Sequence, residues 1–158
     1  MDKIYMAKII AITNQKGGVG KTTTTVNLTA ILADLGQRIL VIDMDPQGNT
    51  TSGLGMEVAE NSIYEVLTGH KTAAACIEET PWRNLSIIGS DIRLAGAEPE
   101  LTGMERREYR LKMALAEAKE QFDFVFIDCP PSLGLLTLNA LTAADTVLVP
   151  IQCEYYAL

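Results

Sequence analysis

Cysteine, histidine and aromatic residues are scarce in this 158-residue sequence. It has three cysteines, one histidine and one tryptophan, and aromatic residues make up 6% of the chain. Cys76, Cys129 and Cys153 form no CxxC pair, so we expect reduced, buried thiols rather than a disulfide or metal framework. The single histidine, His70, lies in a polar stretch and is expected at the surface, and without partner ligands it cannot form a zinc site.

Long apolar runs and an excess of basic residues are also missing. No run approaches the roughly 20 apolar residues that a membrane-spanning helix needs, and residues 1–8 lack a signal-peptide pattern, so we expect a cytoplasmic protein. The formal net charge of −7 argues against a basic nucleic-acid-binding face on this part of the protein. The residues that are present, 47% hydrophobic and 21% charged, are typical of a folded globular domain.

Short apolar runs alternate with segments of helical periodicity along the chain. They predict strands at 8–13, 38–42, 84–89, 122–127 and 146–151, and helices at 21–35, 62–67, 105–121 and 135–144. This alternation predicts an α/β fold with a mostly parallel, twisted sheet and helices on both faces. Residues 46–55 are rich in Gly, Thr, Ser and Asn and are expected to form a functional or mobile loop.

Residue types suited to phosphate and metal chemistry follow the ends of three of these strands. A glycine-rich turn follows the first strand, Asp43 follows the second, and Asp128 follows the fourth. Parallel sheets bind ligands at the carboxyl ends of their strands, so we expect one site at this edge of the sheet.

The turn after the first strand has the composition of a phosphate-binding loop. Glycines let successive backbone N–H groups point toward an anion, and the following helix presents its positive end to it. Lys21 is then expected to contact the β- and γ-phosphates, and the Thr22 hydroxyl to ligate Mg²⁺. The residues expected around the phosphates are Gly17, Gly18, Val19, Gly20, Lys21, Thr22 and Thr23.

This loop departs from the common pattern GxxxxGK[ST], because Gln15 stands where that pattern has its first glycine. Residues 16–23 resemble instead KGGxGK[ST][ST], the deviant phosphate loop of the ParA/MinD class of ATPases. In this class the extra lysine, here Lys16, reaches the partner's phosphates across a nucleotide-sandwiched dimer. The resemblance therefore implies ATP and Mg²⁺ as cofactors, an ATP-dependent homodimer, and a catalytic role for Lys16 that offsets charge on the transferred phosphoryl group.

Two further strings carry the resemblance. Residues 43–49 read DMDPQGN, and an Asp-Pro pair by itself indicates only a turn. ParA-type ATPases carry DxDPQGN here, which implies that Asp45 positions the attacking water and that Asp43 lies near the outer shell of the metal. Residues 128–134 read DCPPSLG and match the switch segment of the same family. Asp128, at the end of an apolar strand, then has the place of a Walker B carboxylate that binds Mg²⁺ through water.

The resemblance covers nearly the whole chain and is strongest to chromosome-partitioning ATPases of the ParA/Soj type. It implies a dimer switch for chromosome or plasmid partitioning that binds DNA non-specifically with ATP and is stimulated by a ParB-type partner. Members of this family are longer, so residues 1–158 are expected to be the N-terminal portion of a single P-loop ATPase domain. The DNA-binding and adenine-contacting residues would then lie outside the chain, and strand 146–151 would form an exposed apolar edge. A nucleoid-associated, cytoplasmic location without membrane binding is expected.

Three other functions remain open from the sequence. A MinD-like ATPase would cycle on a membrane through a C-terminal amphipathic helix. A metabolic enzyme of the same fold would transfer phosphate to a substrate rather than to water, which Lys16 and Asp45 argue against. The chain could also be an inactive, binding-only fragment, although its phosphate-loop and acidic site residues are intact.

Overall fold

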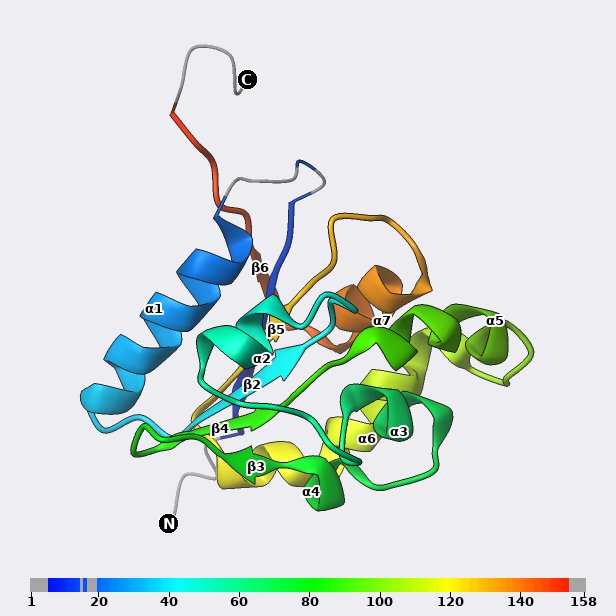
Figure 1. Ribbon diagram of the computed structural model, residues 1–158, viewed down its shortest axis with the longest axis horizontal. Coiled ribbons are helices and arrows are strands. Elements are labelled where there is room, and N and C mark those ends of the chain that lie inside the picture. The colour runs from blue at the N-terminus through cyan, green and yellow to red at the C-terminus, as the bar shows by residue number, and fades with distance from the viewer. Residues whose placement is uncertain (1–5, 15, 17–19, 154–158) are drawn as a thin grey trace.

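The computed structural model describes residues 6–14, 16 and 20–153, which form one sheet covered by helices (Figure 1). Within this part of the chain the strand order is β3-β4-β2-β5-β1-β6. Every neighbouring pair is parallel except β3 with β4. The strands are β1 (Lys8–Ile12), β2 (Ile39–Asp43), β3 (Glu78–Glu79), β4 (Leu85–Ile88), β5 (Phe124–Asp128) and β6 (Thr146–Leu148).

Helices cover both faces of this sheet. They are α1 (Lys21–Asp34), α2 (Asn49–Gly53), α3 (Ile63–Thr68), α4 (Ala73–Cys76), α5 (Ala97–Thr102), α6 (Arg110–Ala118) and α7 (Leu135–Ala143). The helix α1 packs on one face, and α3, α6 and α7 pack on the other (Figure 1). The predicted fold class is therefore confirmed.

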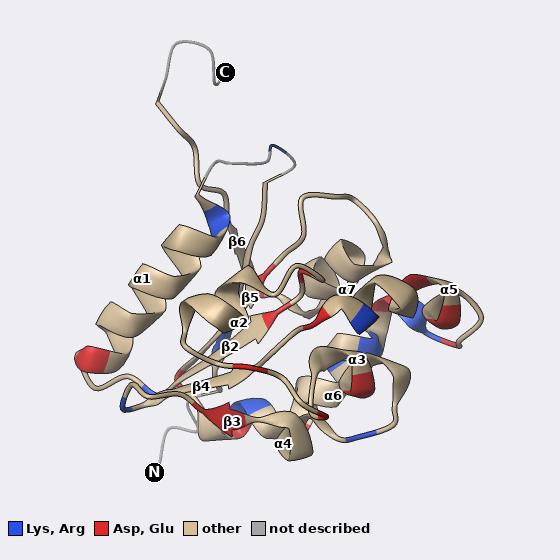
Figure 2. Ribbon diagram, viewed as in Figure 1, with Lys and Arg blue, Asp and Glu red and all other residues tan. Residues whose placement is uncertain are grey.

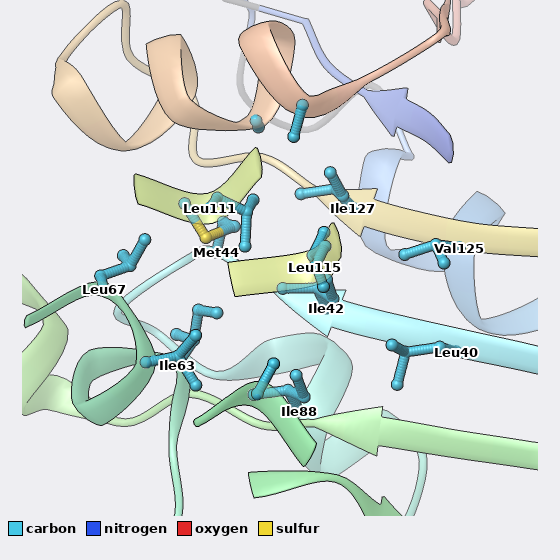
Figure 3. Close-up of a cluster of buried hydrophobic side chains, with 14 of the residues drawn as sticks. Leu40, Ile42, Met44, Ile63, Leu67, Ile88, Leu111, Leu115, Val125 and Ile127 are labelled. Carbon is cyan, nitrogen blue, oxygen red and sulfur yellow. The ribbon is translucent and has the colours of Figure 1, made fainter. Parts of the chain in front are cut away.

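The central strand β2 explains why both faces must be covered. All five of its residues are buried, and successive side chains of a strand point to opposite faces. Leu40 and Ile42 join the larger core cluster, which includes Leu115 of α6 (Figure 3). Ile39 and Val41 join the smaller cluster beneath α1. A strand whose apolar side chains point to both faces thus needs helices on both sides.

The prediction of a loop over residues 46–55 is wrong for Asn49–Gly53, which form α2. Gly48 precedes the helix with a φ of 64°, in the left-handed region that favours glycine. Thr50 and Thr51 of α2 are buried, and their hydroxyls donate hydrogen bonds to carboxylates at strand ends. The Thr50 contact spans 78 residues, so helical periodicity alone does not reveal this helix.

The prediction of one helix over residues 105–121 is confirmed in part, because residues 107–121 are helical but not α-helical throughout. Only α6 is α-helical there, with 3₁₀ turns at Arg107–Tyr109 and Lys119–Gln121. Asn139 of α7 accepts a hydrogen bond from the Leu111 amide and donates one to the Arg107 carbonyl. A side chain from another helix thus binds the backbone where α6 begins.

Other boundaries differ less. The last strand ends at Leu148 rather than at residue 151, shortly before Pro150, which has no N–H to donate to a sheet. The short antiparallel strand β3 and the helical segment formed by the 3₁₀ turn Ile92–Gly96 and α5 were not predicted.

The outer strand β6 leaves apolar side chains exposed, as predicted. It pairs only with β1 in the described sheet, and Val147 and the following Val149 and Ile151 are exposed. Such an edge can pair with further chain.

The thiol prediction holds in part. Cys76 and Cys129 are buried and free, whereas Cys153 is exposed, which corrects the prediction for that residue. His70 is exposed as predicted. Within residues 6–14, 16 and 20–153, no helix is both long enough and apolar enough to span a membrane.

Candidate nucleotide and magnesium site

The parallel strands β2, β5 and β1 lie side by side and bring their carboxyl ends to one edge of the sheet. Asp43 and Asp128, the last residues of β2 and β5, are directly paired in register. The predicted strand-end residues are therefore brought together.

The described part of the phosphate loop leads into α1. Gly20 has a φ of 82° and precedes the helix without a side-chain cap, so no described side chain occupies the first amides of α1. Lys21, the first residue of α1, is buried with 9% of its surface exposed. Figure 2 shows the start of α1 in the blue of the Lys and Arg residues. Thr23 is exposed, as is Lys16, whose amide donates to Asn14 Oδ1 at 2.9 Å. Gly17, Gly18 and Val19 lie outside the described residues.

Among the described residues, only one oxygen of Asp128 has hydrogen-bond partners. Its Oδ2 accepts hydrogen bonds from the hydroxyls of Thr22 at 3.1 Å and Thr50 at 2.5 Å. Its Oδ1 is buried without a hydrogen-bond partner among the described residues. Burial raises the pKa of Asp128, while the hydrogen bonds from the two threonines and the charge of Lys21 lower it. A buried carboxylate oxygen without a partner beside the Thr22 hydroxyl fits the oxygen ligands of a hydrated Mg²⁺ ion.

Asp43 is fully buried, but both of its oxygens have donors. Oδ2 accepts bonds from the Thr51 hydroxyl at 2.7 Å and the Thr51 amide at 2.9 Å, and Oδ1 accepts one from the Asp45 amide at 3.1 Å. Burial raises the pKa of Asp43 to about 6, against the lowering effect of these hydrogen bonds. The carboxylate thus ties α2 and the Asp45 backbone to the end of β2.

Asp45 lies on a pocket of about 580 Å³ that gathers four distant parts of the chain. The pocket is lined by residues 20–23, by Asp45, Gln47 and Asn49, by Pro131 of the DCPPSLG string, and by Gln152. One Asp45 oxygen, Oδ1, accepts a bond from the Gln47 amide at 2.9 Å. The pocket therefore combines phosphate-loop residues with a carboxylate that borders open space.

Sequence reasoning missed Thr50, Thr51 and Gln152 as residues of this site. The first two stand next to the recognised DMDPQGN string, and hydroxyl-bearing residues after strand-end aspartates are the signal that could have indicated them. Gln152 follows the last strand of the described sheet and carries no comparable signal.

A family comparison decides what kind of protein has this site. The AAA_31 family, described as an AAA domain, matches residues 7–158. The chain belongs to this family. It is 59% identical over 155 residues to the sporulation initiation inhibitor protein Soj of Bacillus subtilis, covering 97% of this chain and 61% of Soj. It is 52% identical to the chromosome partitioning protein ParA of Myxococcus xanthus, covering 97% of this chain and 55% of that protein. The resemblance to the ParA/Soj type is thereby confirmed.

Two solved structures similar to this chain contain ATP or an ATP analog. Cobyrinic acid a,c-diamide synthase from Mycobacterium smegmatis, solved with a bound ATP analog and magnesium, matches with a TM-score of 0.91 and 47% identity. The match covers 96% of this chain and 63% of that one. The ATP complex of McdA from Cyanothece matches with a TM-score of 0.90 and 30% identity, covering 96% and 59%. This chain thus spans less than two thirds of the length of the relatives named here.

Proposed function

We propose that this chain carries the nucleotide-binding and magnesium-binding residues of a ParA/Soj-type partition ATPase. The observation that supports this most directly is the hydrogen bond from Thr22 of the phosphate-loop region to Asp128, beside a pocket that Lys21 and Asp45 line. Residues 1–158 then form the N-terminal portion of a single P-loop ATPase domain.

Each site residue has a chemical task in this proposal. The amides of Gly17, Gly18, Val19, Gly20, Lys21, Thr22 and Thr23 and the Lys21 ammonium hold the ATP phosphates at the positive end of α1. Thr22 and Asp128 hold Mg²⁺, which neutralises charge on the phosphate oxygens. The place of Asp43 in the outer shell of the metal stays a prediction.

Asp45 is proposed to orient the water that attacks the γ-phosphate. Its Oδ1 accepts a bond from the Gln47 amide, which fixes the carboxylate at the pocket wall. An oriented carboxylate can accept a hydrogen bond from water and align it with the phosphorus.

Dimerisation, DNA binding and stimulation by a partner are proposed for the whole protein, of which this chain is a part. ATP binding forms a homodimer in which Lys16 contacts the phosphates held by the partner subunit. The dimer binds DNA non-specifically through residues beyond this chain, on the nucleoid in the cytoplasm, and a ParB-type partner stimulates hydrolysis and release. The net charge of −7 on this chain agrees with a DNA-binding face elsewhere.

Phosphate release by the full-length protein, with and without DNA and a ParB-type partner, tests the proposal. We expect slow hydrolysis that DNA plus partner raises and that Lys16→Ala abolishes. Lys112→Ala removes an exposed lysine on α6, away from the site, and should leave the rate unchanged. If DNA leaves the hydrolysis rate unchanged and lipid vesicles raise it, the partition function is refuted and MinD-like membrane cycling is favoured.

A second candidate function follows from the 47% identity to the Mycobacterium smegmatis cobyrinic acid a,c-diamide synthase. ATP-dependent amidation of cobyrinic acid by the full-length protein, with glutamine or ammonia as nitrogen donor, would support it. In that reaction the phosphoryl acceptor is a carboxylate substrate, so Asp45→Ala would leave the rate largely intact. Loss of all ATP consumption in Asp45→Ala instead favours water as acceptor.

A further inference from the structure

Two successive threonines of α2 bind the carboxylates at the ends of two neighbouring strands. Thr50 donates to Asp128 Oδ2 at 2.5 Å, and Thr51 donates to Asp43 Oδ2 at 2.7 Å. Asp43 and Asp128 are paired across the neighbouring strands β2 and β5, so two successive residues of α2 bind two adjacent strand ends. This short helix is therefore attached to the sheet through the acidic pair of the site.

The two hydroxyls that donate to Asp128, those of Thr22 and Thr50, differ in burial and in access to the pocket. Thr22 lies on the pocket and is the expected Mg²⁺ ligand, and its bond to Asp128 is 3.1 Å long. Thr50 is fully buried, and its bond to the same oxygen is the shorter of the two. Hydrogen bonds from a hydroxyl to an ionised carboxylate are about 2.5–2.7 Å long and are the strong ones.

The Thr50 bond also decides which Asp128 oxygen is available. With Oδ2 held by two hydroxyls, Oδ1 is left buried and without a partner among residues 6–14, 16 and 20–153. Asp128 is 1% exposed and Thr50 0%, so solvent cannot readily replace the Thr50 hydroxyl. Groups that hydrogen-bond a metal-binding carboxylate fix its orientation and commonly change metal affinity about 10- to 100-fold when removed.

We infer that Thr50 is a positioning residue that holds Asp128 with Oδ1 directed to the hydrated Mg²⁺ ion. The inference rests on the proposed function. It also links the metal to the segment that carries Asp45, because α2 begins four residues after Asp45 and Thr51 and the Asp45 amide bind the same Asp43 carboxylate.

Calorimetric titration of ADP into the full-length protein, in MgCl₂ and in EDTA, tests the inference by binding rather than by turnover. We expect Thr50→Val to lower the Mg²⁺-dependent gain in ADP affinity by about 10- to 100-fold. The ADP affinity in EDTA should stay unchanged. Thr50→Ser restores the hydroxyl and should restore the gain. If the valine variant does not fold, Thr50→Ala provides the same comparison.

Ser52→Ala is the control, since it removes a hydroxyl of the same helix that donates to the Gly48 carbonyl rather than to a carboxylate of the site, and it should keep the Mg²⁺-dependent gain. If Thr50→Val keeps the wild-type Mg²⁺-dependent gain in ADP affinity, the inference is overturned, whatever the melting temperature of the variant. An equal loss in both variants also overturns it, because the integrity of α2 would then be responsible. A wild-type protein that binds no ADP in either buffer refutes the proposed function itself.

Discussion

Burial of the Asp43 carboxyl should make the stability of this chain depend on pH. Asp43 has no exposed surface, and burial raises its pKa from 3.8 to about 6. Each pKa unit corresponds to about 1.4 kcal/mol, so ionised Asp43 costs the folded state about 3 kcal/mol. Asp43→Asn removes this titration.

The direction of this pH dependence follows from where the folded and unfolded chains bind a proton. Between about pH 4 and pH 6 the folded chain keeps a proton on Asp43 that the unfolded chain has released. The contribution of Asp43 to the free energy of unfolding is therefore fully present below about pH 4 and is lost as pH rises through about 6. The free energy of unfolding of the wild type minus that of Asp43→Asn should thus fall by about 3 kcal/mol across this window.

Urea denaturation followed by circular dichroism, in EDTA buffers across this pH range, measures the difference. Asp123→Asn is the control of opposite sign, because hydrogen bonds from Arg38 lower the pKa of Asp123. The contribution of Asp123 to the free energy of unfolding is present above the ordinary pKa of 3.8 and is lost as pH falls through the lowered pKa of the folded chain. A difference for Asp43→Asn that stays constant or increases with pH would refute the assignment of a buried, proton-holding Asp43.

Two further predictions concern packing and backbone strain. Gly48→Ala places a side chain at a φ of 64° and a Cβ 3.0 Å from the Ser90 carbonyl oxygen, so it should lower the free energy of unfolding by about 1–3 kcal/mol. Gly36→Ala, at a φ of 90° but with no atom within 4 Å, should cost less in the same urea titration. Leu115→Ala empties part of the core and should cost about 2–5 kcal/mol. Met113→Ala, partly exposed on the same helix, should cost about 0.5 kcal/mol or less, and thermal unfolding compares the two.

Much of the fold could be predicted because the central strands are apolar at nearly every position. A run such as Ile39–Ile42 has few alternatives to a strand covered on both faces, and the helical period of α1 supplies one of the covers. The phosphate loop stays a prediction, which the sequence supports for a related reason. Its glycines and Lys21 are neighbours in sequence, and a loop that folds around phosphate needs its residues close together.

The elements that were mispredicted depend on distant partners. The start of α6 is set by Asn139, 28 residues after Leu111, and α2 is held by carboxylates from two strands. Local propensity does not include such contacts, and tertiary hydrogen bonds of buried groups override it.

The sequence by itself determined the strand-and-helix alternation and the acidic residues at the strand ends, and it predicts a phosphate loop, because each is a property of residues close together in the chain. Only the tertiary structure decided that Asp128 Oδ2 is bound by Thr22 and Thr50, from 106 and 78 residues away, while Oδ1 has no partner in the described part of the chain. Strand order and register place Asp43 beside Asp128, and helix packing brings the Thr50 hydroxyl to them. The orientation of a buried carboxylate depends on the donors around it, and those donors meet only when the sheet has formed.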